Sequence, residues 1–200
     1  MSPIKIKLFV ALILLVIFNL NMCTAQRVYV DPNQQIENEI AGKKIVVLNF
    51  WSIFCLPCLK ELPAISNLYN SYRDDKNISI YTIALNSGDE LNQFFSGDTT
   101  NIYGKIYKKL NLKITFPIIT YNIHNNDFNY KLNAISTNVK NDSALSLLYS
   151  KFHLVGIPTT IIFFKGKEYK RFIGFEGDEV QYQKKISENL SYLSNYNNGN

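Results

Sequence analysis

The chain alternates between apolar, β-branched runs and stretches in which apolar residues recur every three or four positions. Runs of the first kind predict strands, and stretches of the second kind predict helices. The predicted strands span residues 28–30, 45–51, 78–85, 116–121, 159–164 and 168–173. The predicted helices span residues 56–72, 90–112 with an interruption at 97–100, 143–152 and 178–194, ahead of a frayed polar tail at 195–200. This order predicts an α/β fold in which helices flank a central mixed sheet.

Two of the strand signals are specific, whereas one segment is weakly patterned. Residues 45–51 are nearly all apolar, which is typical of a central strand buried on both faces. Residues 159–173 predict a hairpin, because a Lys-Gly-Lys turn joins two β-rich runs. Residues 122–142 are rich in Asn, and we expect an insertion between core elements there.

The N-terminal segment has the layout of a secretory signal. Two lysines precede an apolar run at residues 8–18, and small residues lead up to Ala25. This layout predicts a signal peptide over residues 1–25, cleaved after Ala25, and one domain over residues 26–200. We therefore expect an exported protein of the periplasm or cell envelope.

Two other readings of this segment would keep the protein at a membrane. A retained transmembrane anchor is disfavoured, because the apolar run is shorter than the roughly 20 residues that a spanning helix needs. Attachment of a lipid at Cys23 is the second alternative. Met22 is a poor match to the small residue usually found before a lipidated cysteine, which disfavours it.

Charge and cysteine content narrow the class of protein. The formal net charge of +5 falls to +3 without residues 1–25, which contain two lysines and no acid. This charge is mild and forms no basic block interleaved with aromatics, so nucleic-acid binding has no support. Of the three cysteines, only Cys55 and Cys58 lie outside the predicted signal peptide, which is too few for a disulfide-stapled scaffold.

The spacing of Cys55 and Cys58 predicts a redox-active pair. They follow the strand at 45–51 and stand at the start of the helix at 56–72. A helix N-terminus lowers the pKa of the first thiol by favouring its thiolate. We expect Cys55 to be the exposed attacking thiolate and Cys58, one turn further in, to be the resolving thiol.

Two other uses of such a pair are weaker. Half of a zinc site would need nitrogen ligands from His124 and His153, which lie far apart and outside finger-like spacing. An inert structural disulfide over so short a loop would restrict the unfolded chain little. We therefore expect no metal and no cofactor other than the Cys55–Cys58 couple itself.

Several motifs together resemble one family. The matching residues are Asn49-Phe50-Trp51, Cys55-Leu56-Pro57-Cys58, Glu61, Pro63 and Gly174. They closely resemble the thioredoxin-like thiol:disulfide oxidoreductases of the TlpA/ResA type, which are bacterial cell-envelope proteins. Residues 155–160 resemble the cis-proline loop of that fold, followed by its hairpin. The resemblance spans roughly residues 40–190, with 122–142 as the main departure.

The resemblance implies a client-binding surface around the dithiol. Pro158 in cis would bring the backbone of Ile157 beside Cys55, where it could pair with an extended substrate strand. Trp51 would lie beneath the dithiol, and Pro57 lies between the two cysteines. A trans proline that simply starts a strand is the alternative for Pro158.

One acidic residue is a candidate proton acceptor. Proteins of the thioredoxin type usually carry a buried Asp where this chain has Asn49, and Asn cannot exchange a proton. Glu61, three residues past Cys58, matches an acidic position near the dithiol of the ResA-like family. It could accept the proton of Cys58 if burial raises its pKa. A solvated Glu beside Lys60 is the alternative.

These features predict an exported reductase of protein disulfides. The resemblance implies client proteins with disulfides or thiols, apocytochrome c being the best-known type, and an upstream dithiol donor that could be membrane-bound. Leu56 and Pro57 supply no charge or imidazole that would favour the thiolate, which leans toward a reductant. A disulfide-donating oxidant and a non-catalytic interaction module are the alternatives. A peroxiredoxin-like peroxidase is disfavoured, because its Pro-x-x-x-Thr-x-x-Cys signature would require Pro at Leu48 and Thr at Ser52.

Overall fold

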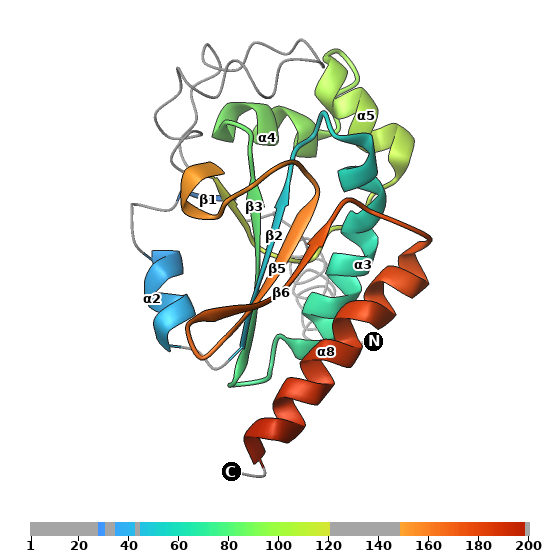
Figure 1. The fold of residues 1–200 in the computed structure, drawn as a ribbon. Coiled ribbons are helices and arrows are strands. Elements are labelled where there is room, and N and C mark those ends of the chain that lie inside the picture. The colour runs from blue at the N-terminus through green and yellow to red at the C-terminus, as the bar shows by residue number, and fades with distance from the viewer. Residues whose placement is uncertain (1–27, 31–34, 43–44, 121–148, 199–200) are drawn as a thin grey trace, which may run out of the picture.

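The computed structural model describes residues 28–30, 35–42, 45–120 and 149–198, which include one six-stranded sheet with helices on both faces (Figure 1). The strands are β1 (Val28–Val30), β2 (Ile45–Trp51), β3 (Ile78–Ala84), β4 (Ile118–Thr120), β5 (Thr159–Phe164) and β6 (Lys167–Ile173). The helices are α2 (Gln35–Gly42), α3 (Leu56–Tyr72), α4 (Gly88–Ser96), α5 (Ile102–Leu110) and α8 (Glu179–Asn198). The α/β fold with a mixed sheet is therefore confirmed.

Strand β2 lies inside the sheet, whose order is β1-β4-β3-β2-β5-β6. It pairs in parallel with β3 and antiparallel with β5. All seven of its residues are buried, as its apolar sequence predicts. The register places Asn49 beside Thr160 of β5, which brings two distant polar residues together inside the sheet.

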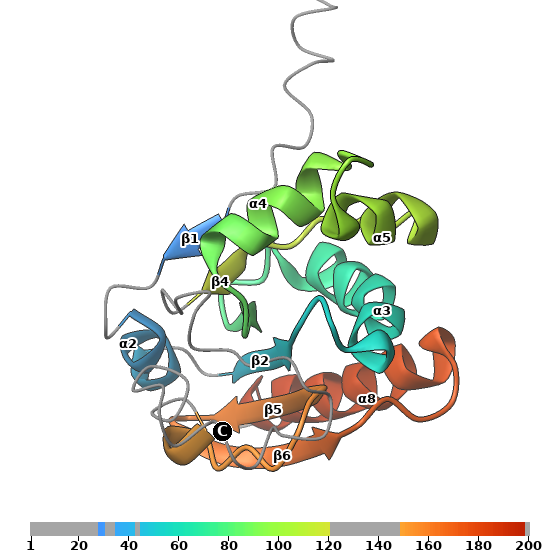
Figure 2. The ribbon, with the colours of Figure 1, turned by 90° about the horizontal axis from the view of Figure 1, so that it is seen from above.

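Successive side chains of β2 enter two different cores, because side chains alternate across a strand. Val47 and Trp51 belong to the core shared with α3 and α8, whereas Leu48 and Phe50 belong to the opposite core, which contains Ile36 of α2. Figure 2 shows α3 and α8 along one face of the sheet and α2 on the other. By this alternation Asn49 shares the α3 and α8 face.

Helices α4 and α5 replace the single interrupted helix predicted at 90–112. Ser87 caps α4, where its side chain accepts from the backbone of Glu90 and the Glu90 carboxylate accepts from the backbone of Ser87. Gly97 ends α4 in the left-handed region with φ 63°, which glycine adopts readily. Asn101 caps α5 through its side chain. The interruption predicted at residues 97–100 is thus confirmed.

Two features differ from the sequence-based prediction. Helix α2 was not predicted, because its eight residues carry only a short apolar pattern around the buried Ile36. Helix α8 continues to Asn198. The prediction of a frayed tail from residue 195 is therefore wrong for residues 195–198. The ring of Tyr196 meets that of Phe164 on β5 at a centroid distance of 6.2 Å, which holds the last turns of the helix against the sheet.

Several predictions fall outside the described residues. These are the signal peptide over 1–25, the alternative lipid site at Cys23, the insertion at 122–142 and most of the helix predicted at 143–152. Among the helices that are described, none combines the length and the apolar character required to cross a membrane.

Candidate active site

The two cysteines of the motif form a disulfide at the N-terminus of α3, with their Cα atoms 5.1 Å apart. Cys55 is the N-cap residue, and its Sγ accepts a hydrogen bond of 3.2 Å from the backbone N–H of Cys58. Cys55 is partly exposed, whereas Cys58 is completely buried. The predicted difference in exposure is confirmed. A thiolate at Cys55 would be stabilised by the same N–H and by the helix N-terminus.

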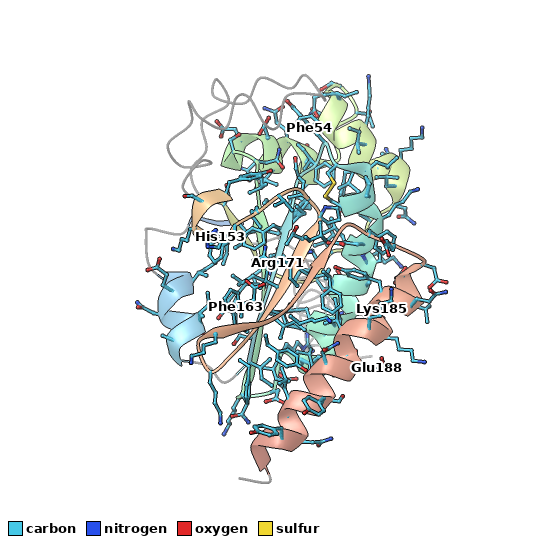
Figure 3. The ribbon with its side chains drawn as sticks, viewed as in Figure 1. Phe54, His153, Phe163, Arg171, Lys185 and Glu188 are labelled. Atoms are coloured by element: carbon cyan, nitrogen blue, oxygen red, sulfur yellow. A yellow bond between two sulfur atoms is a disulfide. The ribbon has the colours of Figure 1, made fainter. Side chains whose placement is uncertain are left out.

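The loop that leads into Cys55 is held by the turn after β3 and by α5. The backbone N–H of Ile53 donates to Oδ1 of the buried Asn86 at 3.0 Å. The ring of Phe54 meets the ring of Tyr103 edge-on, with centroids 5.6 Å apart. Figure 3 shows Phe54 at the end of the molecule where α3 begins. Sequence reasoning missed Asn86, because it follows a strand and looked like an ordinary turn residue.

The loop before β5 lies against the disulfide. The Ile157–Pro158 peptide bond is cis, as predicted, and the Ile157 carbonyl oxygen lies 3.7 Å from Sγ of Cys55. The Pro158 carbonyl accepts from the backbone N–H of Gly174 at 2.8 Å. Gly174 has φ 79°, a conformation that suits glycine, and so ties the second hairpin strand to this loop.

The residues that the resemblance assigned to client binding differ in exposure. Pro57 is exposed and Ile157 is half-buried, so both are accessible beside the disulfide. Trp51 is completely buried in the same core as Cys58, which leaves its side chain out of a client's reach in this structure. Leu56, next to Cys55, and Val155, two residues before Ile157, are exposed apolar residues with exposed fractions of 54% and 77%.

Glu61 is fully buried on α3, which excludes the solvated alternative. The amide Nδ2 of Asn49 donates to its Oε1 and also to Oγ1 of Thr160, the latter at 2.9 Å. Burial raises the pKa of Glu61 from 4.5 to about 8, while hydrogen bonds from Asn49 and Tyr182 lower it in part. At neutral pH the buried carboxyl of the disulfide form therefore carries a proton.

Two further residues complete this buried polar group. Oγ1 of Thr160 lies 2.8 Å from the hydroxyl of Tyr182, which comes from α8. Neither residue was singled out from the sequence, because Thr160 read as part of a β-run and Tyr182 as part of an amphipathic helix. The register of Asn49 with Thr160 in the folded sheet identifies Thr160, and the contact of Thr160 with the Tyr182 hydroxyl identifies Tyr182.

The structure describes one of the two histidines of the chain, His153. His153 is exposed, and its backbone carbonyl accepts from Arg171 (Figure 3). His124 lies outside the described residues. Within the described ranges, no cluster of three His, Cys, Asp or Glu side chains has the geometry of a metal site.

The model of the AhpC/TSA family matches residues 22–167. The chain belongs to this family. The sequence motifs resemble the TlpA/ResA type, and a curated relative supports this resemblance. The thiol-disulfide oxidoreductase ResA of Oceanobacillus iheyensis is 37% identical over 62 residues, which are 31% of this chain and 31% of that protein. The match thus spans about a third of the relative's length.

Solved structures with a similar fold share little sequence with this family member. StoA from Bacillus subtilis has a TM-score of 0.41 and 20% identity, with coverage of 71% of this chain and 82% of that chain. The thioredoxin domain of a thiol-disulfide oxidoreductase from Bacteroides vulgatus has a TM-score of 0.46 and 18% identity, covering 76% and 81%. These low values support no conclusion about activity.

Proposed function

We propose that this AhpC/TSA family member is a thiol:disulfide oxidoreductase that exchanges its Cys55–Cys58 couple with disulfides of client proteins. The observation that carries the proposal is the position of Cys55. Cys55 is partly exposed and caps α3, and its sulfur lies 3.7 Å from the carbonyl oxygen of Ile157 in the cis-proline loop. A strand of a client that paired with the Ile157 backbone would bring its own disulfide to this sulfur.

In the reducing direction the reaction has two balanced steps. The Cys55 thiolate attacks a client disulfide, forms a mixed disulfide and releases one client thiolate, which takes up a proton. Cys58 then loses its proton and attacks Sγ of Cys55, which forms the intramolecular disulfide and releases the second client thiolate. Two electrons pass to the client, and the disulfide form described above is the product.

Glu61 supports the second step as a proton acceptor. It lies three residues beyond Cys58 on α3, so the two side chains share one face of the helix. The proton that leaves Cys58 can pass to the buried carboxylate. Because the pKa of Glu61 is raised to about 8 in the disulfide form, the carboxyl keeps that proton at neutral pH.

We infer further that the protein works as a reductant outside the cytoplasm. Leu56 and Pro57 bring no cation or imidazole next to the thiolate, and the N-terminal sequence has a secretory layout. A reductant in a compartment where disulfides persist needs an upstream dithiol donor. Proteins with paired cysteines, such as the apocytochrome c implied by the TlpA/ResA resemblance, are the proposed clients.

Cys58→Ser is expected to trap a client on Cys55. Without the resolving thiol the first step still forms the mixed disulfide, but the second step cannot break it. With insulin as the client, non-reducing electrophoresis and mass spectrometry should show a covalent adduct. Dithiothreitol should reduce the mixed disulfide and release the client. Cys55→Ser is the matched variant and should form no adduct through the buried Cys58. Equal trapping by both variants would contradict the assigned roles.

The reduction potential of the Cys55–Cys58 couple is expected to lie near the roughly −270 mV of thioredoxin. The basis is that no charged side chain between the cysteines stabilises the reduced form. Equilibration with glutathione or dithiothreitol buffers, followed by thiol alkylation, measures the value. A potential near about −120 mV would instead identify a disulfide donor and would reverse the proposed direction.

A further inference from the structure

A continuous line of buried polar groups joins helix α8 to the dithiol helix. The hydroxyl of Tyr182, whose side chain is only 3% exposed, lies 2.8 Å from Oγ1 of Thr160 on β5. Oγ1 of Thr160 accepts from Nδ2 of Asn49 on β2 at 2.9 Å, and the same amide donates to Glu61 on α3. Four elements thus contribute one group each to a line that ends at the Glu61 carboxyl.

The amide of Asn49 donates in both of its hydrogen bonds, whereas either hydroxyl can donate in the contact between Thr160 and Tyr182. Asn49 uses both N–H bonds of its amide, one toward Glu61 and one toward Thr160. Thr160 accepts from Asn49, and its own hydroxyl proton is available for the oxygen of Tyr182. The Tyr182 proton is then available to the Glu61 carboxyl, in agreement with the lowering of the Glu61 pKa by a hydrogen bond from Tyr182.

Few groups orient the Glu61 carboxyl in the part of the chain that the structure describes. Among the described residues, the Asn49 amide from β2 and the Tyr182 hydroxyl from α8 hydrogen-bond to it, with Thr160 of β5 between them. In the reduced protein the Cys58 thiol, one turn away on the same helix, is added. Oε2 of Glu61 has no hydrogen-bond partner among the described residues, so the line through Asn49 is its main anchor. Loss of a link would leave buried polar groups unpaired.

We propose that Tyr182, through its own hydroxyl and through Thr160 and Asn49, is a positioning residue that holds the Glu61 carboxyl and controls its protonation. This inference rests on the proposed function, since it gives α8 a part in the step in which Cys58 loses its proton. The role requires the phenolic hydroxyl and not the ring. The ring itself packs edge-on against Phe172 and Phe175, with centroid distances of 6.4 and 5.3 Å.

Tyr182→Phe tests the proposal, because it removes the hydroxyl and keeps these ring contacts. We expect the Glu61 pKa in the disulfide form to rise by about one unit, since a donor to the carboxylate is lost. Carbon-13 NMR of the glutamate carboxyl groups, titrated against pH, measures this shift without any turnover. The pH profile of the resolving step, followed in single turnovers with insulin, should move in the same upward direction.

Two further variants separate positioning from a general loss of packing. Thr160→Val breaks the same line while Tyr182 is present and should also displace the Glu61 titration, whereas Thr160→Ser keeps the hydroxyl and should restore it. Tyr192→Phe removes a hydroxyl from the same helix at a side chain that is 59% exposed, and should change neither measurement.

An unmoved Glu61 titration in folded Tyr182→Phe would overturn the positioning role, even if insulin is reduced normally. Failure of the unmodified protein to reduce insulin would overturn the proposed function instead, and the carboxyl titration would still decide the role of Tyr182. The two failures are therefore distinguishable.

Discussion

Cys55→Ser is expected to reduce the turnover of protein disulfides to the uncatalysed background, a loss of at least about a thousandfold. Cys55 is the partly exposed thiol at the helix N-terminus, whereas Cys58 is completely buried and cannot take over the attack. Insulin reduction driven by dithiothreitol measures the loss. It is the largest effect expected of any single substitution in this chain.

Cys23→Ser in a chain that retains residues 1–25 is the matched control, because it changes the same residue type outside the motif. Its turnover should equal that of the unmodified protein. If Cys55→Ser kept its activity, dithiol exchange would be wrong as the function. If the unmodified protein showed no turnover and both forms bound a partner equally, the interaction-module alternative would be supported.

The unmodified protein is expected to lose stability as the pH rises from about 4.5 to 8, and Glu61→Gln is expected to remove this loss. Burial raises the pKa of Glu61 from 4.5 in the unfolded chain to about 8 in the folded disulfide form. Within that window the folded state holds a proton that the unfolded state releases, so the free energy of unfolding decreases as pH rises. The full shift corresponds to roughly 5 kcal/mol, and a few kcal/mol are expected once water penetration and relaxation reduce it.

Gln resembles the protonated carboxyl in shape and carries no charge at any pH. The variant should match the unmodified protein near pH 4 and exceed its stability near pH 9, as measured by urea unfolding of the disulfide form. Glu176→Gln, at an exposed position, is the control and should leave the curve unchanged. If the free energy of unfolding changed with pH in the same way for Glu61→Gln and the unmodified protein, the pKa of Glu61 would not be raised by burial.

The same substitution should slow the resolving step by about 10² to 10⁴ at neutral pH, because Cys58 loses its proton acceptor. Attack by Cys55 should keep its rate, so the mixed disulfide accumulates transiently. Quenched-flow trapping of the intermediate separates the two steps.

Much of the fold follows from local signals. Three elements follow from local patterns: the apolar run of β2, the periodicity of α3 and the turn between β5 and β6. The first two patterns predict which face of the element is buried. The exposure of Cys55 and the burial of Cys58 also follow from the local sequence. Cys55 is the N-cap of α3, and Cys58, three residues later, lies on the side of the helix that faces the core. The sequence by itself therefore determined the position of the dithiol and the α/β class.

The tertiary structure alone decided which groups surround the candidate proton acceptor. Asn49 and Thr160 are 111 residues apart, and they meet because β2 and β5 pair in one particular register. Periodicity predicts that a strand has two faces, but it does not name the residue opposite, nor the helix that covers it. Glu61 is buried because α8 closes over α3 and brings Tyr182 with it, and that packing is a property of the whole domain rather than of any one segment.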